Sequence, residues 1–317
     1  MSSAQGKLIV LAIGGNSLIK DPAHKTVRDQ YDAVLETCQS IAELCRQGHR
    51  VVVTHGNGPQ VGFILRRSEL SAHELHIVPL DSCGADTQGA IGYQLQMGMY
   101  NVTRDWPERK RVATVVTQVL VDRDDPAFAA PSKPIGSFMD EATATQRKTT
   151  DGWHVVEDAG RGFRRVVASP RPIEILELDA IKRLIDDDFV VVAVGGGGIP
   201  VVKDADGTLR GSEAVIDKDL ASSLLARELK ADLLFISTAV EKAYLDYGKP
   251  DQRPIDRMTA AEARQYLKEG HFKPGSMKPK IQAMLEFIET GGREALLADP
   301  PNLLRAVAGE TGTRLVP

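Results

Sequence analysis

Three glycine-rich turns, each at the end of an apolar run, are the segments of this sequence best suited to hold an anion. They occur in LIVLAIGGN (Leu8–Asn16), VVVTHGNG (Val51–Gly58) and VVVAVGGGG (Val190–Gly198). Glycine has no Cβ, so backbone N–H groups can approach an oxyanion, and a helix that follows adds the positive end of its dipole. One such turn can be merely a tight corner between a strand and a helix. Three of them predict a shared anion site.

Three lysines could supply positive charge to that site. Lys133 lies in SKPIGSF, and Lys280 lies one turn into a predicted helix. Lys218 lies between Asp217 and Asp219. The two aspartates could hold an ammonium group, cap a helix or reach a metal, although a cap with a solvated ion pair is the plain alternative. Each lysine alone is more often a surface residue, but together with the glycine turns they favour the transfer of a phosphoryl group.

Other interpretations of the glycine turns and of their neighbour His55 stay open. Gly56, Gly58 and Gly62 follow a strand, which also permits a dinucleotide site and hence an NAD-linked dehydrogenase. Pro59, however, lacks one of the backbone N–H groups that would bind the phosphates of a dinucleotide, and the other two turns would have no role in such a site. His55 could be a catalytic acid or base, or it could orient its loop through a bond to the backbone. The sequence lacks the P-loop and protein-kinase motifs, so ATP would need another fold.

Composition excludes several classes of partner. With 39 basic and 43 acidic residues and only 5% aromatic residues, we expect neither steering of nucleic acid nor stacking of its bases. No stretch approaches the roughly 20 apolar residues of a membrane span, and the first apolar run fits a strand better than a signal peptide. Cys38, Cys45 and Cys83 lack the spacing of a zinc site or a disulfide framework. We therefore expect a cytoplasmic protein.

The elements that must carry these residues alternate along the chain. Apolar residues recur every three or four positions from Val27 to Cys45, which predicts a helix between strands at Leu8 and at Arg50–Thr54. Such a unit favours a parallel sheet. Helices are further predicted near 59–71, 84–99, 179–187, 219–230, 277–290 and after a capping box at 259–262, and strands at 112–121 and 232–237. The predicted fold is a three-layer α/β/α sandwich with a central, mainly parallel sheet, which binds ligands at the carboxyl ends of its strands.

Two lobes and a protruding lid are expected. Residues 122–165 combine acidic turns and prolines at 126, 131 and 134 with no long apolar periodicity, which indicates an insertion. We expect an N-terminal substrate lobe over 1–210 that includes this lid at 122–165, and a C-terminal nucleotide-binding lobe over 211–317.

Eight segments in order resemble one family over nearly the whole chain. They are AIGGNSL, THGNGPQVG, TQGAIGY, KPIGSF, GRGFRRVVASP, GGGGIPV, AVIDKDLAS and FKPGSMKPKIQA, and together they resemble the carbamate kinases of the amino-acid kinase superfamily. The resemblance implies reversible phosphoryl transfer between ATP and carbamate, giving ADP and carbamoyl phosphate, with Mg²⁺ carried by the nucleotide phosphates. It also implies a homodimer that runs toward ATP in the catabolism of arginine or a related nitrogen compound.

The resemblance assigns roles residue by residue. Phosphoryl and carbamate contacts would come from the glycine turns, at Gly14, Gly15, Asn16, Gly56, Asn57, Gly58, Gly195, Gly196 and Gly197. Lys218 and Lys280 would neutralise the phosphate, Asp219 would orient these two lysines, and the lid residue Lys133 would reach the substrate. The nucleotide would lie near Asp217, Thr238, Ala239, Val240, Tyr244 and Met277. No metal ligand is assigned to the protein itself.

Two further alternatives remain at this stage. One is another kinase of the superfamily, acting on an amino-acid carboxylate or a phosphate monoester, although the Leu11-Ala12-Ile13 neighbourhood lacks the lysine that acetylglutamate-type kinases place there. The other is a non-catalytic sensor of nucleotide or phosphate that keeps the fold. The lysines argue for catalysis. Carbamate is already an anion, so its attack needs positioning and charge neutralisation and no general base.

Overall fold

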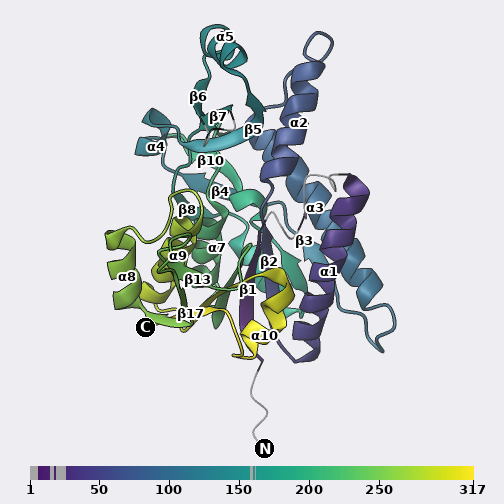
Figure 1. Cartoon of the computed structure of the whole chain (residues 1–317). Helices are drawn as coiled ribbons and strands as arrows, with labels where there is room; N and C mark the ends of the chain where they lie inside the picture. The colour runs from purple at the N-terminus through teal and green to yellow at the C-terminus, as the bar shows by residue number, and fades with distance from the viewer. Residues whose placement is uncertain (1–5, 15–17, 19–25, 158–159, 161) are drawn as a thin grey trace, which may run out of the picture.

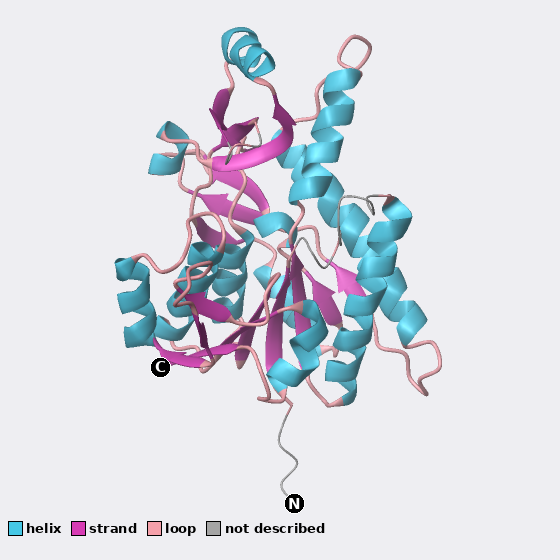
Figure 2. Cartoon of the chain, viewed as in Figure 1, coloured by secondary structure: helices cyan, strands magenta, loops and turns pink. Residues whose placement is uncertain are grey.

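The computed structural model describes residues 6–14, 18, 26–157, 160 and 162–317. Among them, an eight-stranded sheet lies between helices on both faces, which confirms the predicted three-layer α/β/α fold (Figures 1 and 2). Its strands are, in spatial order, β15 (Arg257–Thr259), β17 (Thr313–Val316), β16 (Ala295–Ala298), β12 (Leu233–Ser237), β1 (Leu8–Ile13), β2 (Arg50–His55), β9 (Val190–Val192) and β3 (Val112–Thr114). All neighbours pair in parallel except β16 and β17. The sheet is therefore mainly parallel, as expected.

The side chains of β1 alternate between the two helical layers, because successive residues of a strand point to opposite faces. Ile9 and Leu11 belong to a core shared with the helices on one face. Those helices are α1 (Val27–Arg46), α3 (Leu80–Val102) and α10 (Leu303–Val307). On the other face, Val10 and Ala12 share a core with side chains of α6 (Leu178–Asp186), α7 (Lys218–Glu228), α8 (Ala260–Glu269) and α9 (Met277–Glu289). Both faces of the sheet are thus buried.

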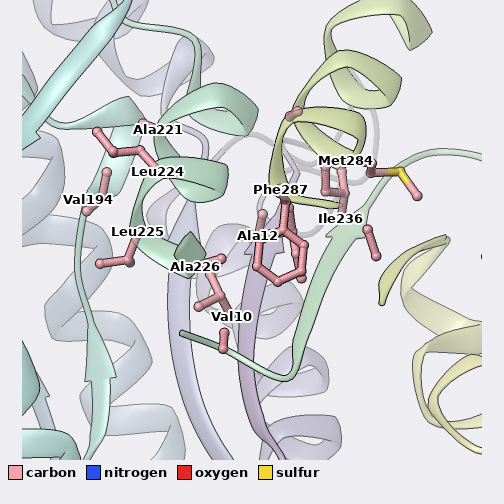
Figure 3. Close-up of a cluster of buried hydrophobic side chains, with 14 of the residues drawn as sticks. Val10, Ala12, Val194, Ala221, Leu224, Leu225, Ala226, Ile236, Met284 and Phe287 are labelled. Carbon is pink, nitrogen blue, oxygen red and sulfur yellow. The ribbon is translucent and has the colours of Figure 1, made fainter. Parts of the chain in front are cut away.

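The second core holds α7 and α9 against the sheet. In Figure 3, Phe287 of α9 lies beside Ala12, and Leu225 of α7 belongs to the same core. Phe287 and Leu225 are fully buried. Burying a side chain of this size stabilises the fold by roughly 1.5–3 kcal/mol. This packing matters for function because α7 and α9 begin with the segments that carry the predicted lysines.

Short-range signals decide where several helices begin. Thr26 and Asp29 form a capping box at the start of α1. Thr259 and Glu262 form the predicted capping box at the start of α8, which ends at Gly270 in the left-handed region. Each box satisfies backbone N–H groups that the first turn of a helix leaves without partners.

The prediction of a single strand over residues 112–121 is wrong. It is divided into β3, at the edge of the central sheet, and β4 (Gln118–Val121), which belongs to a second sheet. That sheet has the order β11 (Leu209–Gly211), β10 (Ile199–Lys203), β4 and β8 (Pro172–Ile175). Thr117 lies at the break, where its N–H donates to Gln88 Oε1 at 2.7 Å and its hydroxyl donates to the Val115 carbonyl at 2.7 Å. These bonds replace the strand ladder and redirect the chain.

The segment expected as an irregular insertion contains regular structure. Strands β5 (Lys133–Met139), β7 (Phe163–Val167) and β6 (His154–Glu157) form an antiparallel sheet that carries α5 (Glu141–Asp151). We call residues 133–167 the lid subdomain; it projects at the top of Figure 1 beside α2 (Gly58–Leu70). The short helix α4 (Pro126–Ala129) precedes it. The lid bounds 122–165 and the lobe boundary at 210/211 stay predictions.

The remaining elements complete the second half of the chain. Strands β13 (Ala243–Leu245) and β14 (Arg253–Ile255) form a hairpin, and short 3-10 helices occupy η2 (Gly195–Gly197) and η3 (Pro300–Asn302). A turn at residues 204–207 joins the antiparallel strands β10 and β11. Within the described ranges, no helix is both long enough and apolar enough to span a bilayer.

Candidate active site

A cavity of about 220 Å³ lies where the glycine turn after β2 meets the lid strand β5 and the starts of α7 and α9. The carboxyl end of β2 opens toward it, which is where parallel α/β sheets bind ligands. Its lining residues are Gly56, Asn57, Gly58, Val61, Lys133, Pro134, Ile135, Gly196, Val215, Ile216, Asp217, Lys218, Asp219, Gly275, Ser276, Pro279 and Lys280. The cavity thus brings together all three predicted lysines and residues of two glycine turns.

Asp219 bridges two of the lysines. Its Oδ1 accepts from Lys218 Nζ at 2.5 Å, and its Oδ2 accepts from Lys280 Nζ at 2.8 Å. Only 3% of Asp219 is exposed. Burial by itself would raise the pKa of Asp219, but the Lys218 and Lys280 ammonium groups outweigh it and hold that pKa well below its usual range. Asp219 therefore stays ionised and keeps two ammonium groups beside one cavity.

Lys218 experiences opposing influences. Burial lowers its pKa, Asp219 opposes this effect, and the neighbouring Lys280 lowers the pKa further. The net direction is downward from the ordinary value of 10.5. Since the Lys218 side chain is only 13% exposed, the ammonium group would interact with an anion in the cavity under weak solvent screening. The positive charge of Lys218 thus depends on Asp219.

Asp217 serves two elements with its two oxygens. Its Oδ1 caps α7 by accepting from the N–H groups of Asp219, at 2.9 Å, and Leu220, at 3.4 Å. Its Oδ2 accepts from Lys133 Nζ at 2.8 Å. Asp217 therefore joins the lid subdomain to the N-terminus of α7, where the helix dipole adds to the positive charge of the lysines.

The polar side chains of the β2 turn are turned inward. The His55 ring is buried, and its Nδ1 lies 3.1 Å from the Gly56 carbonyl oxygen. Burial, aided by the charge of Lys218, lowers the His55 pKa to about 4. The Asn57 amide donates to Thr87 Oγ1 of α3 at 2.8 Å. Of the two interpretations of His55, the geometry supports loop orientation, because the ring faces its own backbone and the protein interior.

The four-glycine turn packs behind this loop. A Cβ on Gly195 would lie 2.3 Å from His55 Nε2, and a Cβ on Gly196 would lie 2.1 Å from Asn57 Nδ2. A Cβ on Gly197 would lie 2.5 Å from the Ile216 carbonyl oxygen. Gly196 lines the cavity, whereas Gly195 and Gly197 are buried outside its lining. This turn therefore supports the cavity mainly by allowing close packing.

The first glycine turn is described only in part. Gly14 lies beside β12, where an added Cβ would approach the Ser237 carbonyl oxygen to 3.0 Å. Gly15 and Asn16 lie outside the described residues. Their predicted phosphoryl contacts stay predictions.

Apart from Asp217, the residues predicted to bind the nucleotide are not in the cavity lining. They follow β12 or lie near β13 and the start of α9: Thr238, Ala239, Val240, Tyr244 and Met277. The Thr238 N–H donates to the Ala298 carbonyl at 2.9 Å, and Tyr244 is half-buried near Tyr247, with 5.8 Å between ring centroids. Their predicted nucleotide role is not tested by this geometry.

Sequence reasoning missed the polar groups that support the cavity from behind. Gln88 of α3 donates to the carbonyls of Gly195, at 2.9 Å, and Thr117, at 3.1 Å. Thr54 of β2 and Ser222 of α7 share a hydrogen bond of 2.6 Å, and Ser222 also donates to the Lys218 carbonyl at 2.6 Å. A polar residue at a helix position that apolar periodicity assigns to the core is the one signal that could have found Gln88.

The carboxylates of the cavity are already engaged by cations or N–H groups. Asp217 uses one oxygen for the helix cap and one for Lys133, and both oxygens of Asp219 hold lysines. Among the residues that the structure describes, no group of three or more His, Cys, Asp or Glu side chains could hold a metal ion. This donor set fits a metal that arrives on phosphate oxygens.

The arrangement suits a reaction between two anions. Three ammonium groups and a helix N-terminus border a small cavity whose wall also contains glycines and apolar residues such as Ile135 and Val215. The described cavity lining contains no histidine, and the only carboxylates in it are bound to lysines. The site is thus suited to positioning phosphate groups and neutralising their charge, and not to transferring protons.

Comparisons with known proteins agree with this chemistry. A model of the amino acid kinase family matches residues 7–299. Carbamate kinase-like protein YahI of Escherichia coli (strain K12) is 50% identical over 314 residues, which cover 98% of this chain and 99% of that protein. The carbamate kinase of Thermococcus kodakarensis is 45% identical over 98% of this chain and 99% of its own length. The structure of carbamate kinase from Giardia lamblia bound to AMP-PNP matches with a TM-score of 0.92 and 40% identity, covering 99% of both chains.

Proposed function

The chain belongs to the amino acid kinase family and is a kinase-type phosphotransferase, and from this premise we propose that it is a carbamate kinase. The reaction is ATP + carbamate = ADP + carbamoyl phosphate. The observation that carries the proposal is the pair Lys218 and Lys280, which Asp219 holds beside the glycine backbone of the β2 turn. Relatives of similar length that bear the name carbamate kinase support the choice of acceptor.

In the proposed mechanism, catalysis comes from neutralising negative charge and from positioning the two reactants. Lys218 and Lys280 would neutralise the charge of the phosphoryl group during its transfer, and Asp219 would keep both ammonium groups in place. Lys133 would approach from the lid subdomain. The backbone of Gly56, Asn57 and Gly58 would hold the carbamate oxygens. The attacking oxygen is already anionic, so the mechanism needs no general base.

The nucleotide would bind against the second half of the chain, near Thr238, Ala239, Val240, Tyr244 and Met277. AMP-PNP in the Giardia relative supports the use of ATP. Mg²⁺ would enter on the nucleotide phosphates and offset their negative charge, because the described carboxylates of the cavity are engaged by lysines. In that arrangement the protein contributes the lysines and the backbone donors.

The direction of the reaction is proposed to be toward ATP. Carbamoyl phosphate is a mixed anhydride, and the carbamate released with ATP decomposes to ammonia and bicarbonate, so product loss favours ATP formation. A place in the catabolism of arginine or a related nitrogen compound and a homodimer remain predictions from the family resemblance. A cytoplasmic location remains a prediction from the composition of the sequence.

The decisive experiment is to measure ATP formed from ADP and carbamoyl phosphate with Mg²⁺. Lys218→Ala is expected to lower kcat by roughly 10²–10³, the scale of one lost preorganised donor. Lys268→Ala, an exposed lysine of α8, is the matched control and keeps wild-type activity. Wild-type turnover in Lys218→Ala, Lys280→Ala or both would contradict the assigned mechanism.

A substrate panel tests the acceptor. ATP consumption with carbamate is compared with consumption in the presence of N-acetylglutamate, glutamate or UMP. Activity with one of these and none with carbamate would identify a different kinase of the family. Tight ADP binding without any turnover would favour a sensor, and enhancement of NAD(P)H fluorescence would revive the dehydrogenase alternative.

A further inference from the structure

The turn after β2 presents its backbone to the cavity and its side chains to the interior. His55 is 1% exposed and Asn57 is 8% exposed, and both pack against η2. Asn57 is further held by Thr87 of α3. Gly56, Asn57 and Gly58 nevertheless line the cavity. What this segment offers a ligand is therefore its peptide groups.

One hydrogen bond decides how the peptide between Gly56 and Asn57 is turned. In a trans peptide the C=O and N–H bonds point in opposite directions. The Gly56 oxygen is directed to His55 Nδ1, 3.1 Å away on the buried side. The N–H of Asn57 must then point away from the ring. Among the residues that the structure describes, none accepts a hydrogen bond from this N–H.

The neighbouring donors add to the same surface. Gly58 and Gln60 lie in the first turn of α2, whose N–H groups have no partner within the helix. Pro59 between them has no N–H at all. When the Gly56–Asn57 peptide is oriented with its N–H toward the cavity, it therefore supplies a donor close to the position where Pro59 lacks one.

The state of the His55 ring is consistent with a donor at Nδ1. Burial lowers the pKa of His55 to about 4, so the ring is neutral near pH 7 and carries one N–H. Bonding to a carbonyl requires that N–H on Nδ1. Nε2 is buried against Gly195 without a hydrogen-bond partner among the described residues. Among the described residues, the ring's one hydrogen bond is thus the bond to the Gly56 carbonyl.

We propose that His55 is a positioning residue that turns the Gly56–Asn57 peptide so that the Asn57 N–H donates to an oxyanion of the carbamoyl group in the cavity. The proposal rests on the proposed function for the identity of that anion. The orientation of the peptide, by contrast, follows from the His55–Gly56 bond alone. His55 itself need not contact the substrate.

The test is a matched pair of variants, His55→Asn and His55→Leu. An asparagine places an amide N–H close to where Nδ1 was, whereas leucine has a similar branched shape without the donor. Both remove the same outer ring atoms next to Gly195, so their packing losses are similar. His55→Leu is expected to raise KM for carbamoyl phosphate roughly 10- to 100-fold, the range for a lost hydrogen bond to a charged group, and to leave KM for ADP within about twofold. His55→Asn is expected to recover most of the loss.

Two outcomes would overturn the proposal. Wild-type KM for carbamoyl phosphate in His55→Leu would show that the peptide is held by other contacts. Equal loss in both variants, at equal thermal stability, would show that ring packing matters and the donor does not.

A binding measurement separates this proposal from the proposed function. The ¹H–¹⁵N resonance of Asn57 is followed while inorganic phosphate is added. A downfield amide proton shift is expected in the wild type and in His55→Asn, and its absence is expected in His55→Leu. If the wild type formed no ATP from carbamoyl phosphate, the function would fail while this shift still reported peptide orientation. An unchanged Asn57 resonance in the wild type at saturating phosphate would contradict the donor role.

Discussion

Lys133 and Asp217 form a 2.8 Å ion pair that joins the lid subdomain to the N-cap of α7. The second oxygen of Asp217 is used by the helix cap, so the lysine and the cap share one carboxylate. A phosphate group in the cavity would compete with Asp217 for the Lys133 ammonium group. Phosphate binding would then be connected to the contact between the lid subdomain and α7 through a single side chain.

The lid ion pair is expected to matter more for catalysis than for stability. Lys133→Gln should lower kcat/KM for carbamoyl phosphate by about 10²-fold, because one charged donor to the phosphate is lost. The free energy of unfolding should change by less than about 1 kcal/mol, since the Lys133 side chain is 34% exposed and such pairs contribute little. Enzyme kinetics and urea titration measure the two effects. Lys148→Gln, at an exposed lysine of the same subdomain, serves as the control, and comparable kinetic losses in both variants would refute the assignment.

Removing the charge of Asp219 should destabilise the fold and change its pH dependence. Asp219→Asn leaves two buried ammonium groups without their anion, which is expected to cost about 3–5 kcal/mol. The pKa of Lys218, already lowered by burial, should fall further. A lysine with a lowered folded pKa binds fewer protons than in the unfolded chain, so the variant should gain stability as pH rises.

Its activity should move in the opposite direction, because an uncharged lysine no longer neutralises phosphate. Urea titrations and kcat measured from pH 6 to 10 would reveal the two opposing trends. Parallel trends, or a pH profile like that of the wild type, would count against the role given to Asp219.

Acid should destabilise the protein through His55 before it reaches the carboxylates. The folded pKa is about 4 against an ordinary 6.5, so between these values the unfolded chain binds more protons and stability falls as pH falls. The full loss from this group is about 3 kcal/mol, reached near pH 4. Asp219, whose folded pKa is lowered, adds a further loss below its unfolded value near 4.

The histidine contribution can be isolated with His55→Asn, which has no group that titrates in this range. Its free energy of unfolding should decline less steeply between pH 6.5 and 4 than that of the wild type, as measured by urea titration at each pH. Identical slopes for the two proteins would exclude His55 as the source.

The close packing of η2 predicts contrasting effects at two glycines. In Gly195→Ala the new methyl group would lie 2.3 Å from His55 Nε2, so we expect a loss of roughly 1–3 kcal/mol and reduced activity. Gly89 lies within α3, and a Cβ there meets nothing within 4 Å. Gly89→Ala should therefore gain up to about 1 kcal/mol from helix propensity. Thermal unfolding of both variants gives the comparison, and a neutral Gly195→Ala would show that His55 can move aside.

Much of the fold could be predicted from the sequence because its determinants are local. The apolar spacing in α1, the capping box of Thr259 and Glu262 and the strand–helix alternation each depend on residues within one turn or one unit. The prediction of one strand over residues 112–121 failed because the side chain that interrupts the strand is distant in the sequence. Gln88 accepts a hydrogen bond from the Thr117 N–H, 29 positions away. The order within the lid subdomain was missed because its strands are short and half-exposed, and so show weak apolar periodicity.

For the site, the sequence by itself determined the chemical groups: glycine turns after strands, and lysines beside aspartates at helix starts. Only the tertiary structure decided their partners, because the deciding contacts join residues far apart in the chain. Lys133 meets Asp217 across 84 positions, and Lys280 meets Asp219 across 61. The inward turn of His55 and Asn57 was likewise set by packing against η2, which no local pattern encodes. An ion pair or a buried ring depends on three-dimensional proximity, and spacing along one chain does not specify it.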